Sequence, residues 1–367
     1  MNSIINHAAP NVVPGTNFNS QRFQEMFAWI SAMTADVARS TMTPNQFGLL
    51  IPFDGKAALQ LDKKESLLTL RRCSGITPGG KVIGIFEDIT PVLEKSISEY
   101  HLDPKMQYHI VIEVKTVKRT AFGPSTKELP LRPQFSMPDY QIHVQQIDQT
   151  IGHQTNAFPI GLLTYKSGDW ELGNYIPPCA QIGAHEVLRD RYRNYIQDLE
   201  VILNAQPNII RQTDTFRDKA MIELREFALQ CGSYLATQRP ELINLSENGS
   251  PFQLFKNWMS FANLVSFLLN CMTDRSGFYN LLYINTRSVN GVMLTTERLD
   301  NALFHLTSQN YQHQDISNTM LAVDEFLSLI VPMFKALGNG TLRPTRNNYE
   351  NFSKTPVVEN RKTNSTW

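Results

Sequence analysis

Hydrophobic periodicity changes at Pro177-Pro178, and every expectation about the fold starts from that change. Before the proline pair, short runs rich in β-branched and aromatic residues alternate with turn residues, as in a series of strands. After it, apolar residues recur every three or four positions, as along one face of an α-helix. Strands followed by helices are typical of α+β proteins. We therefore expect an α+β multidomain chain with a boundary at residue 178.

The first half, residues 1–178, is expected to form an N-terminal β-sandwich domain. Its clearest strand is 108–117, which contains the run His109-Ile110-Val111-Ile112-Glu113-Val114. Residues 158–165 and 170–176 are spaced to form a hairpin across Lys166-Ser167-Gly168-Asp169. Several short strands joined by Pro/Gly turns are typical of a β-sandwich or a related all-β fold.

Two segments of this half stand outside the strand pattern. Residues 121–138 are rich in proline, so we expect a long surface loop there. Residues 19–38 have helical composition and spacing, with Asn19 or Ser20 as the expected N-cap. The sandwich domain is therefore expected to carry a leading helix.

The second half, residues 179–338, is expected to form a four-helix bundle, because it contains four apolar stripes at helical spacing. The stripes are Leu188–Ile202, Phe216–Leu235, Leu254–Leu268 and Ile316–Leu337. Ser250 and Asp315 are placed as N-caps, and Pro332 is expected to kink or restart the last helix. A short helix is expected near 296–306. Residues 339–367 have few apolar side chains and are expected to form a flexible tail.

Composition argues against several classes of partner. Lys plus Arg and Asp plus Glu are both 34, so the net charge gives no general attraction to nucleic acid or to an anionic membrane. The four cysteines stand singly, which favours buried thiols in a reducing compartment. Residues 1–14 lack a signal-peptide pattern, and the most apolar run, 264–269, is too short to span a bilayer. We therefore expect a cytoplasmic protein.

No catalytic constellation is recognisable in the sequence. His185-Glu186 lacks the second histidine of a zinc-protease motif, and Gly79-Gly80 does not precede a helix as a phosphate loop does. His109 and His143 lie on expected strands, where each could face a neighbour. We therefore expect no enzymatic activity, no catalytic, cofactor-binding or metal-binding residues, and no small-molecule substrate.

Three segments resemble motifs of one protein family. Residues 173–182, Gly-Asn-Tyr-Ile-Pro-Pro-Cys-Ala-Gln-Ile, match the family's strand end, Ile-Pro-Pro and helix entry. Within 18–24, Gln21, Phe23 and Gln24 match a Pro-Gln-His-Phe-Gln motif. Residues 311–315, Tyr-Gln-His-Gln-Asp, resemble the Tyr-x-His-x-Asp entry to the last bundle helix. The motifs occur in the family's order, and the chain thus resembles the TssK (ImpJ/VasE) family of type VI secretion baseplate subunits.

The resemblance implies a sandwich similar to the shoulder domain of phage receptor-binding proteins, then a four-helix bundle, in a homotrimer. It also implies a cytoplasmic place at the inner face of the cytoplasmic membrane, with TssF/TssG-like wedge proteins as partners. Family members carry a C-terminal head that binds the membrane complex. Only about 30 polar residues follow Leu337, so we expect the head to be missing and any membrane anchor to be reached by another route.

Phe18, Phe23 and Phe27 are the candidate partner-binding residues, because they lie on the N-terminal arm that we expect to meet the wedge. The alternative is that these phenylalanines pack on their own β domain. For the whole chain, one alternative is a phage or tailocin baseplate or receptor-binding protein with the same β domain and trimer. Another is an enzyme whose site is assembled from scattered residues, which predicts a pocket with converging polar groups.

Overall fold

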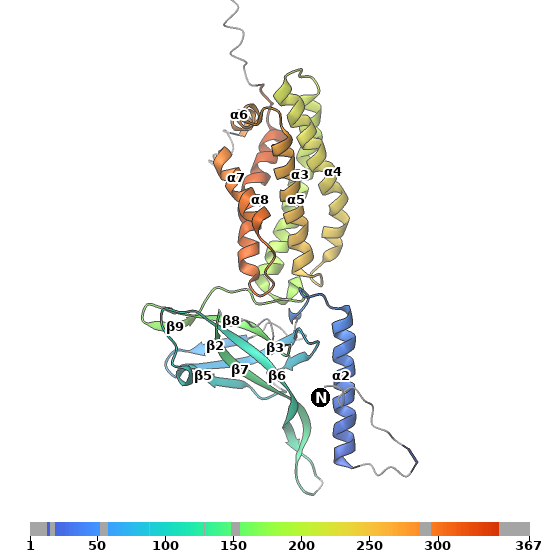
Figure 1. Ribbon diagram of the computed structural model, residues 1–367, viewed down its shortest axis with the longest axis vertical. Coiled ribbons are helices and arrows are strands. Elements are labelled where there is room, and N and C mark those ends of the chain that lie inside the picture. Colours follow the sequence, from blue (N-terminus) through green and yellow to red (C-terminus); the bar gives the residue numbers. More distant parts are fainter. Residues whose placement is uncertain are drawn as a thin grey trace, which may run out of the picture.

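The computed structural model places a β-rich region below a helical region along the long axis of the molecule (Figure 1). Antiparallel sheets and α-helices together confirm the expected α+β class. The structure describes residues 13–14, 19–51, 58–87, 89–127, 129–147, 155–286 and 295–344.

The first sheet is built around one long strand, β3 (Leu67–Ile76), to which the other four strands pair antiparallel. Those strands are β1 (Gly48–Leu49), β2 (Ala58–Asp62), β4 (Val82–Ile85) and β5 (Leu93–Ser96). A 3-10 turn, η1 (Ile97–Tyr100), follows β5. Leu68 and Leu70 of β3 are fully buried and lie two residues apart, so they point to the same face of the strand.

The second sheet has the order β7-β6-β8-β9, with all neighbours antiparallel. Its strands are β6 (Tyr108–Ser125), β7 (Pro133–Gln146), β8 (Ala157–Lys166) and β9 (Asp169–Leu172). The two sheets lie close together at two glycines. A side chain on Gly75 would meet the ring of Phe158, and one on Gly161 would meet the Leu59 side chain.

The expected hairpin between β8 and β9 is confirmed by pairing from Lys166↔Asp169 to Leu163↔Leu172. Its turn uses Ser167 and Gly168, both with positive φ, of 54° and 92°. Two such residues suit the tight turns whose twist matches the flanking strands. The second strand ends at Leu172, earlier than the expected 176.

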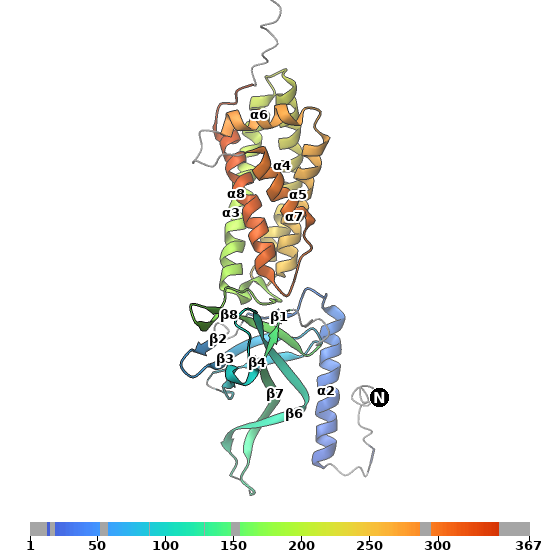
Figure 2. The same ribbon diagram turned by 60° about the vertical axis from the view of Figure 1, so that its left-hand side comes forward.

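The expected surface loop over 121–138 is wrong. β6 and β7 continue to pair as far as Ser125↔Pro133, and Figure 2 shows them projecting from the sheets as a long arm. The rings of Phe122 and Phe135 pack across the arm with centroids 5.7 Å apart. Prolines made the segment look like a loop, yet β7 is an edge strand, where a missing N–H is tolerated.

The leading helix is confirmed as α2 (Ser20–Thr41). Asn19 is its N-cap, and its side-chain oxygen accepts the amide of Arg22 at 2.9 Å. Of the helix, only Ala32 and Ala35 are buried. In both views α2 stands beside the sheets, with its axis close to the long axis of the molecule.

The helical region contains the expected long helices and two shorter ones. In chain order they are α3 (Glu186–Thr213), α4 (Lys219–Leu245), α5 (Pro251–Cys271), α6 (Arg275–Thr286), α7 (Thr296–Ser308) and α8 (Ile316–Asn339), preceded by the 3-10 turn η3 (Ile182–Ala184). The expected short helix is α7, whereas α6 was not foreseen. Ser250 and Asp315 accept the backbone amides of Phe252 and Ser317 at 3.3 and 3.2 Å, so both predicted N-caps are confirmed.

Pro332 does not restart the last helix, because α8 runs unbroken from Ile316 to Asn339. A proline inside a helix removes one backbone hydrogen bond and usually costs about 3 kcal/mol or more. The residues around it, Ile330, Met333 and Phe334, are almost fully buried. Tertiary packing on both sides of the proline therefore outweighs the local penalty.

The start of the predicted tail is bound to the helical region. Leu342 is buried, and its amide donates to the Gln212 side chain on α3 at 2.9 Å. Arg343 exchanges two backbone hydrogen bonds with the Asn285 side chain on α6, at 2.8 and 3.0 Å. The chain is therefore held to residue 343, and the rest of the predicted tail, 345–367, lies outside the described residues.

Three of the four cysteines fit the expected buried thiols. Cys73, Cys179 and Cys231 are buried and free, and burial raises the pKa of the Cys73 thiol to about 12. Cys271, at the end of α5, is exposed, so the expectation is wrong for this residue.

Candidate functional site: the joint between the sheets and the helices

The chain enters the helical region alongside its own first strand. The Leu49 amide donates to the Pro178 carbonyl at 2.8 Å, and the Ala180 amide donates to the Leu49 carbonyl at 2.9 Å. Gly48 has φ of 106°, and a Cβ at this position would lie 2.0 Å from the Pro178 carbonyl oxygen. Only glycine fits such a close approach in this conformation. The proline pair is thereby fixed against β1.

His313, just before α8, ties the helical region to the same segment. Its Nε2 lies 2.8 Å from the Phe47 carbonyl oxygen, and its Nδ1 lies 2.8 Å from the Tyr311 hydroxyl. Since a carbonyl only accepts, Nε2 carries the proton and the hydroxyl donates to Nδ1. The Phe47 ring packs edge-on at 4.6 Å. Burial lowers the pKa of His313 to about 4, so the imidazole is neutral near pH 7.

Tyr175 and Ile176 bind the start of α8 from the other side. The Tyr175 hydroxyl donates to the Gln314 carbonyl, and the Ile176 amide donates to the Ser317 hydroxyl at 3.0 Å. Burial, and then the charge of Asp315, hold the pKa of Tyr175 well above its usual value. The tyrosine is therefore a neutral donor near pH 7.

The loop between α4 and α5 completes the joint. The amides of Ile182 and Gly183 donate to the carbonyls of Gly249 and Glu247 at 2.8 and 2.7 Å. The Ser250 hydroxyl, which caps α5, also reaches the Asn45 carbonyl at 3.4 Å. Buried apolar side chains run continuously from the sheets through this joint into the helices.

Two of the three segments that resemble the TssK family meet in the joint. Residues 173–182 and 311–315 are far apart in sequence, yet the hydroxyl of Tyr175 in the first binds the Gln314 carbonyl in the second. The third segment, 18–24, leads into α2, outside the joint. The sequence did not predict the roles of Phe47 and Ser317. His313 and Phe47 lie 266 positions apart in the chain, and a contact over such a distance does not affect local hydrophobic periodicity.

The predicted partner-binding residues lie on α2 and away from the joint. Phe23 and Phe27 are 47% and 62% exposed, and Phe18 lies outside the described residues. Such large apolar side chains on a helix surface are compatible with a partner contact.

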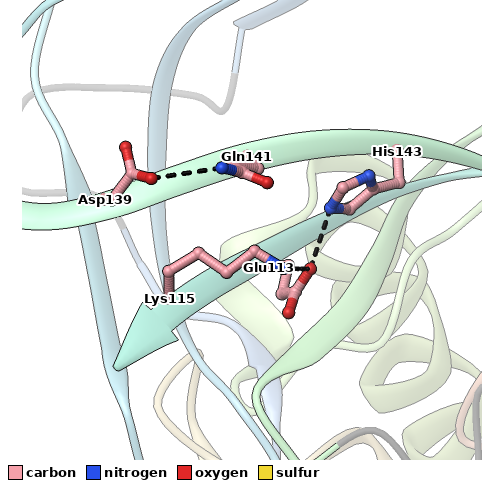
Figure 3. A network of polar contacts seen from close by, with 5 residues as sticks. All are labelled: Glu113, Lys115, Asp139, Gln141 and His143. Carbon is pink, nitrogen blue, oxygen red and sulfur yellow. Dashed lines mark hydrogen bonds and ion pairs between the residues drawn. The ribbon is translucent and has the colours of Figure 1, made fainter. Parts of the chain in front are cut away.

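A polar network crosses β6 and β7 on the sheet face opposite to Ile110 and Ile112 (Figure 3). The Glu113 carboxylate accepts from Lys115 Nζ at 2.6 Å and from His143 Nε2 at 2.8 Å. Burial raises the pKa of Glu113, but the lysine and the histidine together lower it below its usual value. His143 thus faces a neighbour, as the sequence suggested, and His109 packs against Tyr175 with ring centroids 5.2 Å apart.

The network stabilises the pairing of β6 with β7, because its side chains are hydrogen-bonded to one another. Gln141 donates to Asp139 at 3.1 Å beside the Glu113 cluster. The Thr120 hydroxyl donates to Asp139 at 3.0 Å, so this hydroxyl is bound to a carboxylate and not to the histidine that could activate it as a nucleophile. Among the residues described, no three His, Cys, Asp or Glu side chains are grouped to hold a metal ion. No helix within the described ranges has both the length and the apolarity to cross a membrane.

Comparison with known proteins finds similarity in structure alone. No protein-family model matches the sequence, and no curated protein matches it significantly. A TssK crystal structure matches with TM-score 0.52 and 13% identity over 88% of this chain and 68% of its own. TssK of the EAEC type VI secretion system, in complex with a nanobody, matches with TM-score 0.52 and 16% identity over 86% and 99%. A chain of the type VI secretion baseplate complex matches with TM-score 0.54 and 16% identity over 89% and 99%.

The fold is therefore TssK-like, which confirms the resemblance seen in the sequence. The match extends over both the β-rich and the helical regions, since it covers 86–89% of the chain. The joint thus belongs to an arrangement shared with TssK.

Proposed function

We propose that the protein is a structural subunit of a type VI secretion baseplate, linking a baseplate wedge to the rest of the contractile machine. The single observation that carries the proposal is the TssK-like fold over both regions, including a chain solved as part of the baseplate complex. A joint held by hydrogen bonds between the two regions supports the proposal, because a subunit that links two partners needs its regions fixed to one another.

The proposal includes a finer architecture. The two sheets form a sandwich similar to the shoulder of phage receptor-binding proteins, with a domain boundary at residue 178. Helices α3, α4, α5 and α8 form a four-helix bundle over 179–338, with α6 and α7 beside it. The contacts of Phe158 with Gly75 and of Leu59 with Gly161 support face-to-face sheets.

We propose a homotrimer, with TssF/TssG-like wedge proteins as further partners, at the inner face of the cytoplasmic membrane. Phe23 and Phe27 remain the proposed partner-contact residues, with Phe18 beside them in sequence. The last proposed partner is a membrane-anchoring complex. Within the described residues, its proposed contact is the helical region. No enzymatic activity, small-molecule substrate or cofactor is part of the proposal, because the network around Glu113 is explained by strand pairing.

The test is recovery of partners from native cells. A chain carrying a C-terminal affinity tag is purified under mild conditions, and the proteins that elute with it are identified by mass spectrometry. We expect wedge and sheath subunits of a type VI system. A matched control carries Gly48→Val, which destroys the joint and should lose every partner. If the tagged chain elutes without partners, or with metabolic enzymes, the proposed function is contradicted. If phage tail proteins elute with it in place of secretion subunits, the phage alternative is favoured.

A further inference from the structure

The arm formed by β6 and β7 is a ribbon of two strands that projects beyond the rest of the sheet. β8 pairs with β6 only as far as Glu113↔Ala157, whereas β7 stays paired with β6 as far as Ser125↔Pro133. In both views the ribbon points away from the helical region, at the opposite end of the molecule (Figures 1 and 2). We call residues 119–138 the arm and residues 126–132 its tip.

The two strands of the arm are bonded to each other out to the tip. The Arg119 guanidinium donates to the Ser136 hydroxyl and carbonyl at 3.0 and 2.7 Å. Near the end of the ribbon, the Thr126 amide donates to the Arg132 carbonyl at 2.8 Å. The shape of the arm is therefore set within the chain, so a partner that binds the tip does not have to order it.

The arm exposes large apolar side chains at and beside its tip. Leu129 is 89% exposed, the highest value for any large apolar side chain in the described ranges, and Leu131 and Phe135 are 66% and 54% exposed. A single exposed leucine is ordinary on a protein surface. Three such side chains within residues 129–135, at the end of a projecting ribbon, are instead typical of a binding surface.

The arm also carries positive charge. Its sequence contains three basic residues, Arg119, Lys127 and Arg132, all of which are exposed. The one acidic residue between 119 and 138 is Glu128, which lies outside the described residues. The arm is thus positively charged on a chain whose net charge is zero. A surface of this kind is complementary to a partner surface that carries carboxylates.

Two features of the arm disfavour an added strand or a second arm as the partner. Pro133 and Pro138 lie in the edge strand β7, and prolines at a sheet edge disfavour the addition of a further strand. A second copy of the arm would bring the same positive charge, and like charges placed against each other repel. We therefore expect a partner that binds the side chains of the tip and differs from the arm itself.

The position of the arm favours a protein over a lipid surface. Basic residues beside exposed leucines would also suit an anionic membrane. The membrane-anchoring partner, however, is proposed to contact the helical region, and the arm lies at the other end of the molecule. An arm in that position points away from the membrane.

We propose that the tip of the arm inserts Leu129 and Leu131 into an apolar pocket of a different protein, whose rim carries carboxylates that meet Lys127 and Arg132. The leucines supply affinity through the area that they remove from water, and the charges supply specificity and fast association. The inference rests on the proposed function only for the direction of the membrane, and it uses no residue of α2 or of the joint.

Photo-cross-linking in native cells tests the contact. A benzophenone amino acid replaces Leu131 in the full chain, and cross-linked peptides are identified by mass spectrometry. We expect a cross-link to a protein other than this chain, at a segment that contains both apolar residues and carboxylates. Ile89, which is also 66% exposed but lies outside the arm, is the matched control position and should not cross-link to that segment.

The cross-linked protein is then purified, and its affinity for the full chain is measured at low and at high salt. Leu129→Ala combined with Leu131→Ala should weaken binding by about tenfold or more, as at a central hot spot. Lys127→Glu should also weaken binding and reduce its dependence on salt, because an attraction between opposite charges is lost. Lys64→Glu, at an exposed lysine of the β2–β3 turn, is the matched control and should leave the affinity unchanged. All of these positions are exposed, so each variant should keep the urea midpoint of the wild type.

Three results would overturn the inference. The first is the absence of a cross-link from position 131, or a cross-link to another copy of this chain. The second is an affinity that does not change with salt, which would remove the acidic rim. The third is sedimentation of the chain with vesicles of phosphatidylcholine and phosphatidylglycerol in equal parts that is lost in Lys127→Glu, which would assign the arm to a lipid surface.

The arm contact and the proposed function can fail separately. If the tagged chain recovers wedge and sheath subunits while position 131 cross-links to nothing, the arm contact is overturned and the proposed function stands. If position 131 cross-links as expected while the tagged chain recovers no baseplate subunit, the proposed function is overturned and the arm contact stands.

Discussion

The joint and the outer face of α2 present opposite kinds of surface. In the joint, backbone amides, the buried His313 and the half-buried Tyr175 are hydrogen-bonded within one chain. On α2, large apolar side chains such as Phe27 and Val37 are exposed, and the buried residues are Ala32 and Ala35. Hydrogen bonds are directional, so they fix the two regions of the chain in one orientation. An exposed apolar face does not have this directionality, and it can bind a partner and release it. The contacts of the joint hold the fold together, and the exposed face of α2 is the surface that we propose for assembly.

The largest effect should come from breaking the joint at Gly48. In Gly48→Val, the new Cβ would lie 2.0 Å from the Pro178 carbonyl oxygen in a left-handed conformation. We expect a loss of about 4 kcal/mol in the free energy of unfolding, from backbone strain and overpacking together. Urea denaturation followed by circular dichroism measures it.

The control for this change is Gly168→Ala, in the β8–β9 turn. This glycine also has positive φ, of 92°, but a Cβ would have no neighbour within 4 Å. The expected loss is about 1 kcal/mol, from the conformation alone. Equal losses at the two glycines would show that the contact with Pro178 contributes nothing.

The second effect is a dependence of stability on pH through His313. Its pKa is about 4 in the folded protein and 6.5 in its ordinary state, so the unfolded chain binds the proton more readily. The stabilisation is therefore complete above pH 6.5 and declines as pH falls toward 4, by about 3 kcal/mol in total. Urea midpoints between pH 7.5 and about 4 measure this slope.

His313→Gln separates this residue from the other titrating groups. The variant should be less stable at pH 7.5 but should lose less stability on acidification than the wild type. Parallel curves for the two proteins would contradict a buried neutral imidazole in the joint.

A smaller loss is expected from Tyr175→Phe. The substitution removes the donor to the buried Gln314 carbonyl and keeps the ring against His109. Loss of one such hydrogen bond should cost about 1.5 kcal/mol. Tyr165→Phe, at an exposed tyrosine of the same region, is the control and should change the unfolding free energy by less than about 0.5 kcal/mol.

The smallest effect on the chain itself should come from Phe27 on the exposed face of α2. Phe27→Glu should change the unfolding free energy of a dilute single chain by about 0.5 kcal/mol or less, because the residue is exposed. It should instead abolish the rise of melting temperature with protein concentration that self-association gives the wild type. A wild-type melting temperature that does not change over a hundredfold range of concentration would remove the contrast between the two surfaces.

The sequence predicted what depends on local spacing. The helix at 20–41 with its Asn19 cap, the caps at Ser250 and Asp315, and the β8–β9 hairpin all follow from patterns within a few residues. Errors arose where tertiary contacts override such patterns. Of the two outcomes expected at Pro332, the restart does not occur, because packing keeps α8 unbroken. Edge-strand pairing turns a proline-rich segment into an arm.

The candidate site was predictable only in part. The resemblance singled out 173–182 and 311–315, but no local signal joined them to Phe47, which meets His313 through a backbone carbonyl that any residue carries. Phe23 and Phe27 were chosen by resemblance, and their spacing alone could not distinguish a core stripe from a surface one. Only the position of Ala32 and Ala35 against the sheets shows which side of α2 is outside.

Hydrogen exchange read by mass spectrometry, comparing wild type with Phe27→Glu, tests the contrast most directly, because it reports on both surfaces in one experiment. We predict that protection in 20–41 falls sharply in the variant, while protection at 47–51 and 176–183 stays at the wild-type level. Unchanged protection of α2, or a loss that extends into the joint, would contradict a division between a surface that folds the chain and a surface that assembles it.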